Sequence, residues 1–201
     1  MYKKFGLLGI GVIIGLALLL GGWRLVSGPY RYQGSLIDPP VPAGEIQLTN
    51  QDGQPFSLSQ QRGKVVMVFF GFTNCTDVCP VTMAQFKQVK DALGTQAQDV
   101  VFVFITVDPH RDTQPILKAF VNRFDPSFIG LTGTDQQLEQ VYTSYGVYHE
   151  ISHDQHGANY DVQHSSITYM IDKYSNWRLT YPYGTETASL VSDVEHLVAE
   201  K

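Results

Sequence analysis

The sequence predicts an α/β protein, with one mixed sheet flanked by helices and an N-terminal transmembrane helix before it. Three observations lead to this prediction. Two continuous apolar runs of strand length, residues 64–70 and 100–107, are typical of strands that are buried on both faces. Segments with helical spacing of apolar residues alternate with these runs along the chain. Ahead of them stands an uncharged stretch of 19 residues, Phe5 to Trp23.

The uncharged stretch has the length of a membrane span. At about 1.5 Å per residue, a helix of this length covers roughly 28 Å, close to the hydrocarbon core of a bilayer. A cleavable signal has a shorter apolar core and ends in a small-x-small site, whereas the sequence GGWR that ends the stretch offers none. We therefore expect residues 1–26 to be an uncleaved anchor, with the N-terminus inside and the following domain exported.

Composition limits the function classes open to the rest of the chain. Residues 27–44 are rich in Gly and Pro and lack periodicity, so we expect a tether that leads to a domain of residues 45–201. Without Lys3, Lys4 and Arg24, 11 of the 14 basic residues remain against all 19 acidic ones, a balance of about −8. A nucleic-acid-binding protein needs a basic footprint, so this class is excluded.

Turn signals and periodicity predict the elements of the domain in order. Pro80 suits the start of a helix, Gly94 its end, and Thr134 and Gly146 suit the two caps of another. The antiparallel pairs are predicted from apolar runs on either side of polar turns. The predicted elements are a hairpin (46–48 and 56–58), a strand (64–70), a helix (80–93), a strand (100–107), a helix (115–124), a strand (128–131), a helix (135–145), a strand pair (167–171 and 177–181) and a helix (186–200).

Both cysteines of the chain, Cys75 and Cys79, lie in the stretch GFTNCTDVCP, directly after the first buried strand. Pro80 disfavours helical geometry in the residue before it, so we expect Cys79 at or just before the helix cap and Cys75 in the preceding loop. Both sulfurs would then lie near the positive end of a helix dipole, which favours the thiolate. A dithiol between a buried strand and a helix is typical of a thioredoxin-like fold.

The residues alone leave three interpretations of this pair. A purely structural disulfide is the weakest, because closing so short a loop stabilises a fold by only about 2 kcal/mol. A redox pair needs nothing beyond the two sulfurs. A metal site needs a third ligand, and His164, just before the predicted strand 167–171, could reach the cysteine loop. Two thiolates and one imidazole suit copper, with zinc as the main competitor.

Several segments together resemble the Sco/SenC family of copper-delivery proteins, which serve cytochrome c oxidase assembly. They occur in the family's order over nearly all of residues 63–172. The matching stretches are GKVV running into GFTNCTDVCPVTM, then ITVDPHRDT, FDPSFIGLTGT and YDVQHSSITYMID. The sequence departs from the family at two places: Thr76 stands where many members have Pro, and residues 174–177 replace a more usual Gly-containing turn.

This resemblance implies a thioredoxin-like domain that faces the periplasm, or the intermembrane space in mitochondrial members; we expect the bacterial cytoplasmic membrane. It implies one copper, Cu(I) or Cu(II), bound by Cys75, Cys79 and His164. The implied task is to supply copper to the binuclear copper centre of a cytochrome c oxidase subunit, or to prepare the thiols of that centre. Other periplasmic copper chaperones or thiol reductants are further expected partners. Asp108 matches an acidic family residue near the site, and we expect it to support the ligands.

Such a metallochaperone is not expected to be an enzyme. The alternative is a membrane-anchored thiol–disulfide oxidoreductase, for which Cys75 and Cys79 would form the redox-active pair and His164 would be dispensable. A peroxidase is a weaker alternative, because it needs an arginine beside the cysteine loop, and Arg111 is the only candidate by motif order.

A separate cluster of histidines raises a hypothesis of its own. His149, His153 and His156, together with Asp154, lie within eight residues of one another in the sequence. Imidazole and carboxylate groups at this density could form an auxiliary copper or zinc capture point. The plainer interpretation of the same residues is a solvated loop.

Overall fold

The structure is a computed structural model that describes residues 30–153 and 160–200. The chain divides into two compact units, residues 1–32 and 33–201, and in the described end of the first unit Tyr30 and Tyr32 pack edge to face. The expected anchor, residues 1–26, lies outside the described residues. Within the described ranges, no helix combines the length and apolar character that a membrane span requires.

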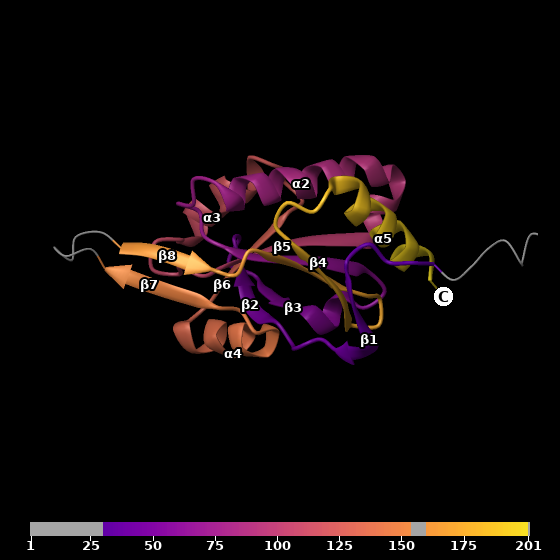
Figure 1. Ribbon diagram of the computed structural model, residues 1–201. Coiled ribbons are helices and arrows are strands. Elements are labelled where there is room, and N and C mark those ends of the chain that lie inside the picture. Colours follow the sequence, from indigo (N-terminus) through magenta and orange to yellow (C-terminus); the bar gives the residue numbers. More distant parts are fainter. Residues whose placement is uncertain (1–29, 154–159, 201) are drawn as a thin grey trace, which may run out of the picture. The chain divides into compact units, whose positions relative to one another are not determined.

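The second unit is built on one mixed sheet of eight strands in the order β1-β10-β9-β4-β5-β6-β2-β3 (Figure 1). Strands β4, β5 and β6 are parallel, and β9 runs antiparallel to β4. Every residue of β4 and β5 is buried, as the continuous apolar runs predict. The strands are β1 (Ser35–Pro42), β2 (Gln47–Asn50), β3 (Pro55–Ser57), β4 (Val65–Gly71), β5 (Val100–Thr106), β6 (Ile129–Thr132), β9 (Ile167–Ile171) and β10 (Asn176–Pro182).

Helices cover both faces of the sheet, and aromatic side chains fill the layers between. Figure 1 shows α2 and α5 over one face and α4 on the other. On the first face Phe86 of α2 packs against Phe102 of β5, with ring centres 5.8 Å apart. On the opposite face Phe70 of β4 packs 5.7 Å from Tyr145 of α4. The helices are α2 (Val78–Leu93), α3 (Gln114–Asn122), α4 (Asp135–Tyr145) and α5 (Thr187–Ala199), with short 3-10 turns η1 (Leu58–Gln61) and η2 (Gly94–Asp99).

The expected tether is partly wrong, because residues 35–42 form strand β1. This strand pairs with β10 at the edge of the sheet, from Ser35 opposite Thr180 to Pro42 opposite Asn176. The backbone N–H groups that precede it, from residues 33 and 34, donate to the carboxylate of Asp193 on α5 at 2.9–3.1 Å. Prolines interrupt the ladder of β1, and edge strands tolerate them. The compact unit therefore begins near residue 33 rather than at residue 45.

A second, two-stranded sheet was not expected from the sequence. Strand β7 (His149–His153) pairs with β8 (Tyr160–His164) in antiparallel register, so that His149 lies opposite His164. In Figure 1 this hairpin projects beyond the end of the main sheet. No ladder between the described residues joins the hairpin to the eight-stranded sheet.

Candidate metal centre

The cysteine loop begins where β4 ends at Gly71. Cys75 lies in this loop and is half-buried, whereas Cys79 is fully buried. Helix α2 begins at Val78, so Cys79 is its second residue and lies inside the helix rather than at or before the cap. The expectation from Pro80 is wrong by two positions, because proline is tolerated in the first turn, where N–H groups lack an intrahelical acceptor. The N–H of Cys79 instead donates to the sulfur of Cys75 at 3.4 Å.

Gly71 is required by how closely the buried sulfur approaches the strand. A Cβ atom at this position would lie 2.8 Å from Sγ of Cys79 and 2.9 Å from ring carbons of Phe69 and Phe104. These separations are shorter than van der Waals contact, and the core that surrounds them is close-packed. The last residue of β4 therefore has no side chain, and the sulfur occupies the space.

His164 reaches the sulfurs from the end of β8. Its Nε2 lies 3.5 Å from Sγ of Cys79, and its Nδ1 lies 3.0 Å from the carbonyl oxygen of Ser165. A carbonyl only accepts hydrogen bonds, so Nδ1 carries the proton and the lone pair of Nε2 is left for the sulfur side. The rings of Phe69 and Phe72 pack edge to face against the imidazole at 5.9 and 5.8 Å.

Cys75, Cys79 and His164 bring their donor atoms within 4.8 Å of one another. Within residues 30–153 and 160–200, no other group of three His, Cys, Asp or Glu side chains converges in this way. Both cysteines are free thiols in the structure. Two sulfurs and one imidazole nitrogen are the donors that a soft ion such as Cu(I) prefers, and imidazole also serves Cu(II). The donor set therefore fits copper.

The hydrogen bond between the two thiols separates their acidities. The hydrogen bond from the Cys79 side chain lowers the pKa of Cys75 well below its usual range. The same hydrogen bond between the two side chains, together with burial, raises the pKa of Cys79. Cys75 is consequently the cysteine that favours the thiolate, and Cys79 would have to lose its proton to bind an ion as a thiolate.

Asp108, expected to support the ligands, lies fully buried in the loop after β5. Its carboxylate accepts hydrogen bonds from Nε of Arg111 and, at 2.6 Å, from the hydroxyl of Tyr160. Tyr160 is the first residue of the strand that ends at His164. Asp108 thus acts on the hairpin that carries the imidazole. Arg111, the candidate for a peroxidase, is engaged in an ion pair with Asp108.

A second buried carboxylate, that of Asp112, was missed by the sequence reasoning. It accepts hydrogen bonds from the backbone N–H and the hydroxyl of Thr73 at 3.0 and 2.5 Å, and from the hydroxyl of Thr106 at 2.6 Å. Burial raises the pKa of this carboxyl. Thr73 stands two residues before Cys75, so Asp112 holds the cysteine loop against the end of β5. The sequence feature that could have identified Asp112 is its place as the second aspartate of the ITVDPHRDT stretch.

The histidine cluster is only partly described. The ring of His149 lies 4.5 Å from that of Tyr142, and its Nε2 lies 3.8 Å from the carboxylate of Glu139. His153 ends β7, and His156 lies outside the described residues. The auxiliary capture point therefore stays a prediction.

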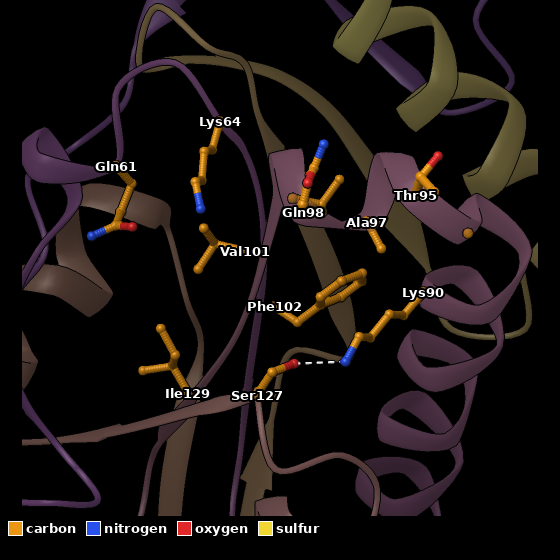
Figure 2. Close-up of a pocket in the computed structure, with 12 residues that line it drawn as sticks. Gln61, Lys64, Lys90, Thr95, Ala97, Gln98, Val101, Phe102, Ser127 and Ile129 are labelled. Carbon is orange, nitrogen blue, oxygen red and sulfur yellow. Dashed lines mark hydrogen bonds between the residues drawn. The ribbon is translucent and has the colours of Figure 1, made fainter.

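A cavity of about 600 Å³ opens at the opposite end of the parallel strands (Figure 2). Lys64 and Lys90 line it, and the amino group of Lys90 donates a hydrogen bond to the hydroxyl of Ser127 at 2.8 Å. Figure 2 marks this bond with a dashed line. Phe102 lies on its apolar side. None of the predicted site residues lines this cavity, so it is separate from the candidate metal centre.

The fold and the donor set define a class of protein: a thioredoxin-like domain with two thiols and an imidazole converging at the end of a parallel strand. The model of the SCO1/SenC family matches residues 37–199, and the chain belongs to this family. A SCO2-like protein of Rickettsia felis is 34% identical over 173 residues, which cover 81% of this chain and 84% of the relative. The resemblance drawn from the sequence motifs is confirmed.

Solved structures agree with this assignment. ScoI of Bradyrhizobium japonicum, determined with copper bound, is 30% identical, with a TM-score of 0.72 over 78% of this chain and 99% of that one. BsSco, described as a member of the Sco family of cytochrome c oxidase assembly proteins with a disulfide switch, is 26% identical, with a TM-score of 0.61 over 82% of this chain and 99% of that one. The expected mixed α/β, thioredoxin-like architecture is thereby confirmed.

Proposed function

We propose that the protein is a membrane-tethered copper chaperone that binds one copper ion through Cys75, Cys79 and His164. It supplies this copper to the binuclear centre of cytochrome c oxidase, or prepares the thiols of that centre. The observation that supports the proposal most directly is the convergence of three donor atoms within 4.8 Å from segments 85 positions apart in the chain. The copper-bound ScoI relative and the description of BsSco as an oxidase assembly protein point the same way.

The donor set suits an ion that must be held and then handed on. With two thiolates and a neutral imidazole, Cu(I) leaves one net negative charge at the site and Cu(II) leaves none. Three protein donors leave a coordination position open, through which a thiolate of the acceptor can bind the ion before the chaperone releases it. If the two thiolates exchange with a disulfide of a partner protein, they form a disulfide while the partner's disulfide is reduced to two thiols, and the site loses two of its three donors for the ion.

The proposed location is based on the N-terminal residues. Residues 1–26 would anchor the chain once in the bacterial cytoplasmic membrane with the N-terminus inside, and the domain would face the periplasm. There it would meet the copper-centre subunit of the oxidase, and other copper chaperones or thiol reductants that load or reduce it. On this view the protein is a metallochaperone rather than an enzyme.

A thiol–disulfide oxidoreductase is the second candidate. The low pKa of Cys75 and the contact between the two cysteines favour it, because a thiolate beside a second thiol is the arrangement that attacks a partner's disulfide. The disulfide switch described for BsSco is consistent with such chemistry. This function needs Cys75 and Cys79 but not His164, which makes the histidine the residue that discriminates the two proposals.

The deciding experiment measures copper and zinc in the full chain, purified anaerobically, beside Cys75→Ala, Cys79→Ala and His164→Ala. We expect one equivalent of copper in the wild type. Each variant should weaken binding by more than about 100-fold, since loss of residues that merely support a metal ligand already costs 10–100-fold. His110→Ala is the matched control, because His110 is an exposed histidine paired with Asp135. Tight, stoichiometric copper in His164→Ala would contradict the three-ligand site and leave the oxidoreductase.

A further inference from the structure

The strand that carries His164 belongs to an element with little support of its own. Strands β7 and β8 form a two-stranded sheet, and no ladder between the described residues joins it to the eight-stranded sheet. A lone two-stranded hairpin is marginally stable in water and needs side-chain packing to hold its place. The position of the imidazole therefore depends on the side chains that fasten β8 to the domain, together with the backbone bond from the N–H of Ser165 to the carbonyl of Tyr148 at 2.9 Å.

One attachment of β8 to the main sheet is a cluster of Asp108, Arg111 and Tyr160, which we call the Asp108 cluster. The hydroxyl of Tyr160 donates to the carboxylate of Asp108 at 2.6 Å, and burial together with this bond raises the pKa of Tyr160 to about 12. The guanidinium of Arg111 lies 3.8 Å from the centre of the Tyr160 ring and donates to the Tyr160 carbonyl oxygen at 3.1 Å. The same guanidinium is paired with Asp108. The first residue of β8 is thus held through its hydroxyl, its ring and its backbone.

Asp108 is itself fixed to the main sheet. Its backbone N–H donates to the hydroxyl of Thr106, the last residue of β5, at 2.9 Å. Its carbonyl oxygen accepts from the N–H of Asp112 at 2.9 Å and from that of Arg111 at 3.2 Å. A fully buried carboxylate that loses a hydrogen-bond donor is strongly destabilised. Release of Tyr160 would leave Asp108 in that state, so the cluster holds β8 firmly.

We propose that Tyr160, Asp108 and Arg111 are positioning residues of the copper site, which hold β8 so that His164 reaches the two sulfurs. The proposal rests on the proposed function. Tyr160 and His164 are the two ends of one strand, about 13 Å apart at the usual rise per residue. When the cluster is broken, β8 is freed at its start and the imidazole is held less closely against the sulfurs, while the cysteine loop stays in place on the main sheet.

The test compares Tyr160→Phe with Tyr145→Phe in the full chain. Tyr160→Phe removes one hydroxyl and keeps the ring beneath Arg111, so the fold is preserved. Tyr145→Phe is the matched control, because it removes a hydroxyl that donates to the carbonyl of Gly44 at 2.7 Å, on a buried tyrosine of α4 outside the hairpin. We expect copper affinity, measured by chelator competition, to fall about tenfold in Tyr160→Phe, as for other residues that orient a metal ligand, and to stay unchanged in Tyr145→Phe.

Two further readouts separate positioning from general stability. Hydrogen exchange should become faster in residues 160–164 of Tyr160→Phe and stay at the wild-type rate in α2. In the Cu(II)-loaded protein, electron paramagnetic resonance should show weaker nitrogen coupling from His164 in Tyr160→Phe. Asp108→Asn, which keeps an acceptor for Tyr160 but loses the charge that binds Arg111, should change all three readouts in the same direction.

The outcomes distinguish this proposal from the proposed function. If His164→Ala binds copper like the wild type, the three-ligand site fails, whatever Tyr160→Phe does. If His164→Ala loses copper while Tyr160→Phe keeps wild-type affinity, exchange and nitrogen coupling, the positioning role is overturned and the copper site stands. Faster exchange in β8 without any change in affinity or nitrogen coupling overturns it as well, because the cluster would then hold the hairpin without placing the ligand.

Discussion

The two sides of the candidate copper site are built by different kinds of structure. Cys79 lies in the first turn of α2 against β4, a central strand of the eight-stranded sheet, and is fully buried. His164 lies at the end of β8, in a separate two-stranded sheet, and is partly exposed. The sulfur side is held by core packing and by the backbone of the parallel strands. The imidazole side is held by side-chain contacts to β8 and by one backbone bond beside it, from Ser165 to Tyr148.

Because of this difference, the cysteine side of the site is suited to hold an ion, and the hairpin side is suited to release it. Elements with few buried contacts open locally at a lower free energy than the core of a domain does. A histidine on such an element can leave the ion while the two cysteines keep their geometry. Under the proposed function, an exchange of ligands with an acceptor would require movement of the hairpin alone, with the main sheet still folded. Substitutions can therefore perturb one side of the site at a time.

The largest effect is expected on the sulfur side, from Gly71→Ala. The added Cβ would meet the sulfur of Cys79 at 2.8 Å and two core rings at 2.9 Å, and none of these atoms can move freely. We expect the free energy of unfolding to fall by about 1–3 kcal/mol, as for other overpacked cores. Copper affinity should fall as well, because the sulfur must shift. Urea unfolding and chelator competition measure the two effects.

Gly63→Ala is the control for that variant. Gly63 precedes the other end of β4, and a Cβ there would meet no atom within 4 Å, although its φ of +92° strains any side chain. Its unfolding free energy should fall by about 1 kcal/mol with copper affinity unchanged. Wild-type stability and wild-type affinity in Gly71→Ala would show that the core around Cys79 is looser than the contacts indicate.

An intermediate effect is expected on the hairpin side, from Val162→Ala. Val162 is the buried residue in the middle of β8, with 5% of its surface exposed. Because the hairpin can open by itself, we expect weaker copper binding with little change in the midpoint of global unfolding. Val194→Ala on α5 is the matched control, and it should lower the unfolding free energy by about 2 kcal/mol without changing copper affinity. Equal losses of global stability in both variants would mean that the hairpin and the sheet unfold together.

The same division explains how far the sequence alone could lead. The sulfur side is built from continuous apolar strands and from a motif of two cysteines before a helix, and both are local patterns. The donor set was inferred from the family resemblance, and the structure brings Cys75, Cys79 and His164 together as that resemblance implies. The sequence alone could not show how the polar residues around the site are arranged. The ITVDPHRDT stretch offers two aspartates, and only the folded loop shows that Asp108 faces Tyr160 while Asp112 faces Thr73.

The elements that were missed share one physical reason. Strand β1 lies at the edge of the main sheet, and β7 and β8 form a separate hairpin. None of the three lies in the buried centre, so they lack the apolar pattern that predicts a strand. Residues 35–42 contain three prolines, which a central strand would exclude but an edge strand allows. Residues 149–164 are rich in histidine and other polar residues, and their pairing depends on contacts with distant segments such as the loop after β5.

The smallest effect is expected at Ser175, in the turn that joins β9 to β10. Ser175 adopts a φ of +64°, in the left-handed region that favours glycine. Its N–H donates to the carbonyl of Asp172 at 3.0 Å, and its own carbonyl accepts from Ala43 at 2.9 Å, so Ser175→Gly keeps both bonds. A left-handed backbone costs a non-glycine residue about 1–2 kcal/mol, and glycine removes this cost. Glycine also makes the unfolded chain more flexible, which lowers the stability of the folded state by up to about 1 kcal/mol. We therefore expect the unfolding free energy to rise by less than about 1 kcal/mol in urea titrations. Copper affinity should stay at the wild-type value, because the turn belongs to the sheet and has no part in the hairpin; a change in affinity would mean that strain in the sheet reaches His164 through β9.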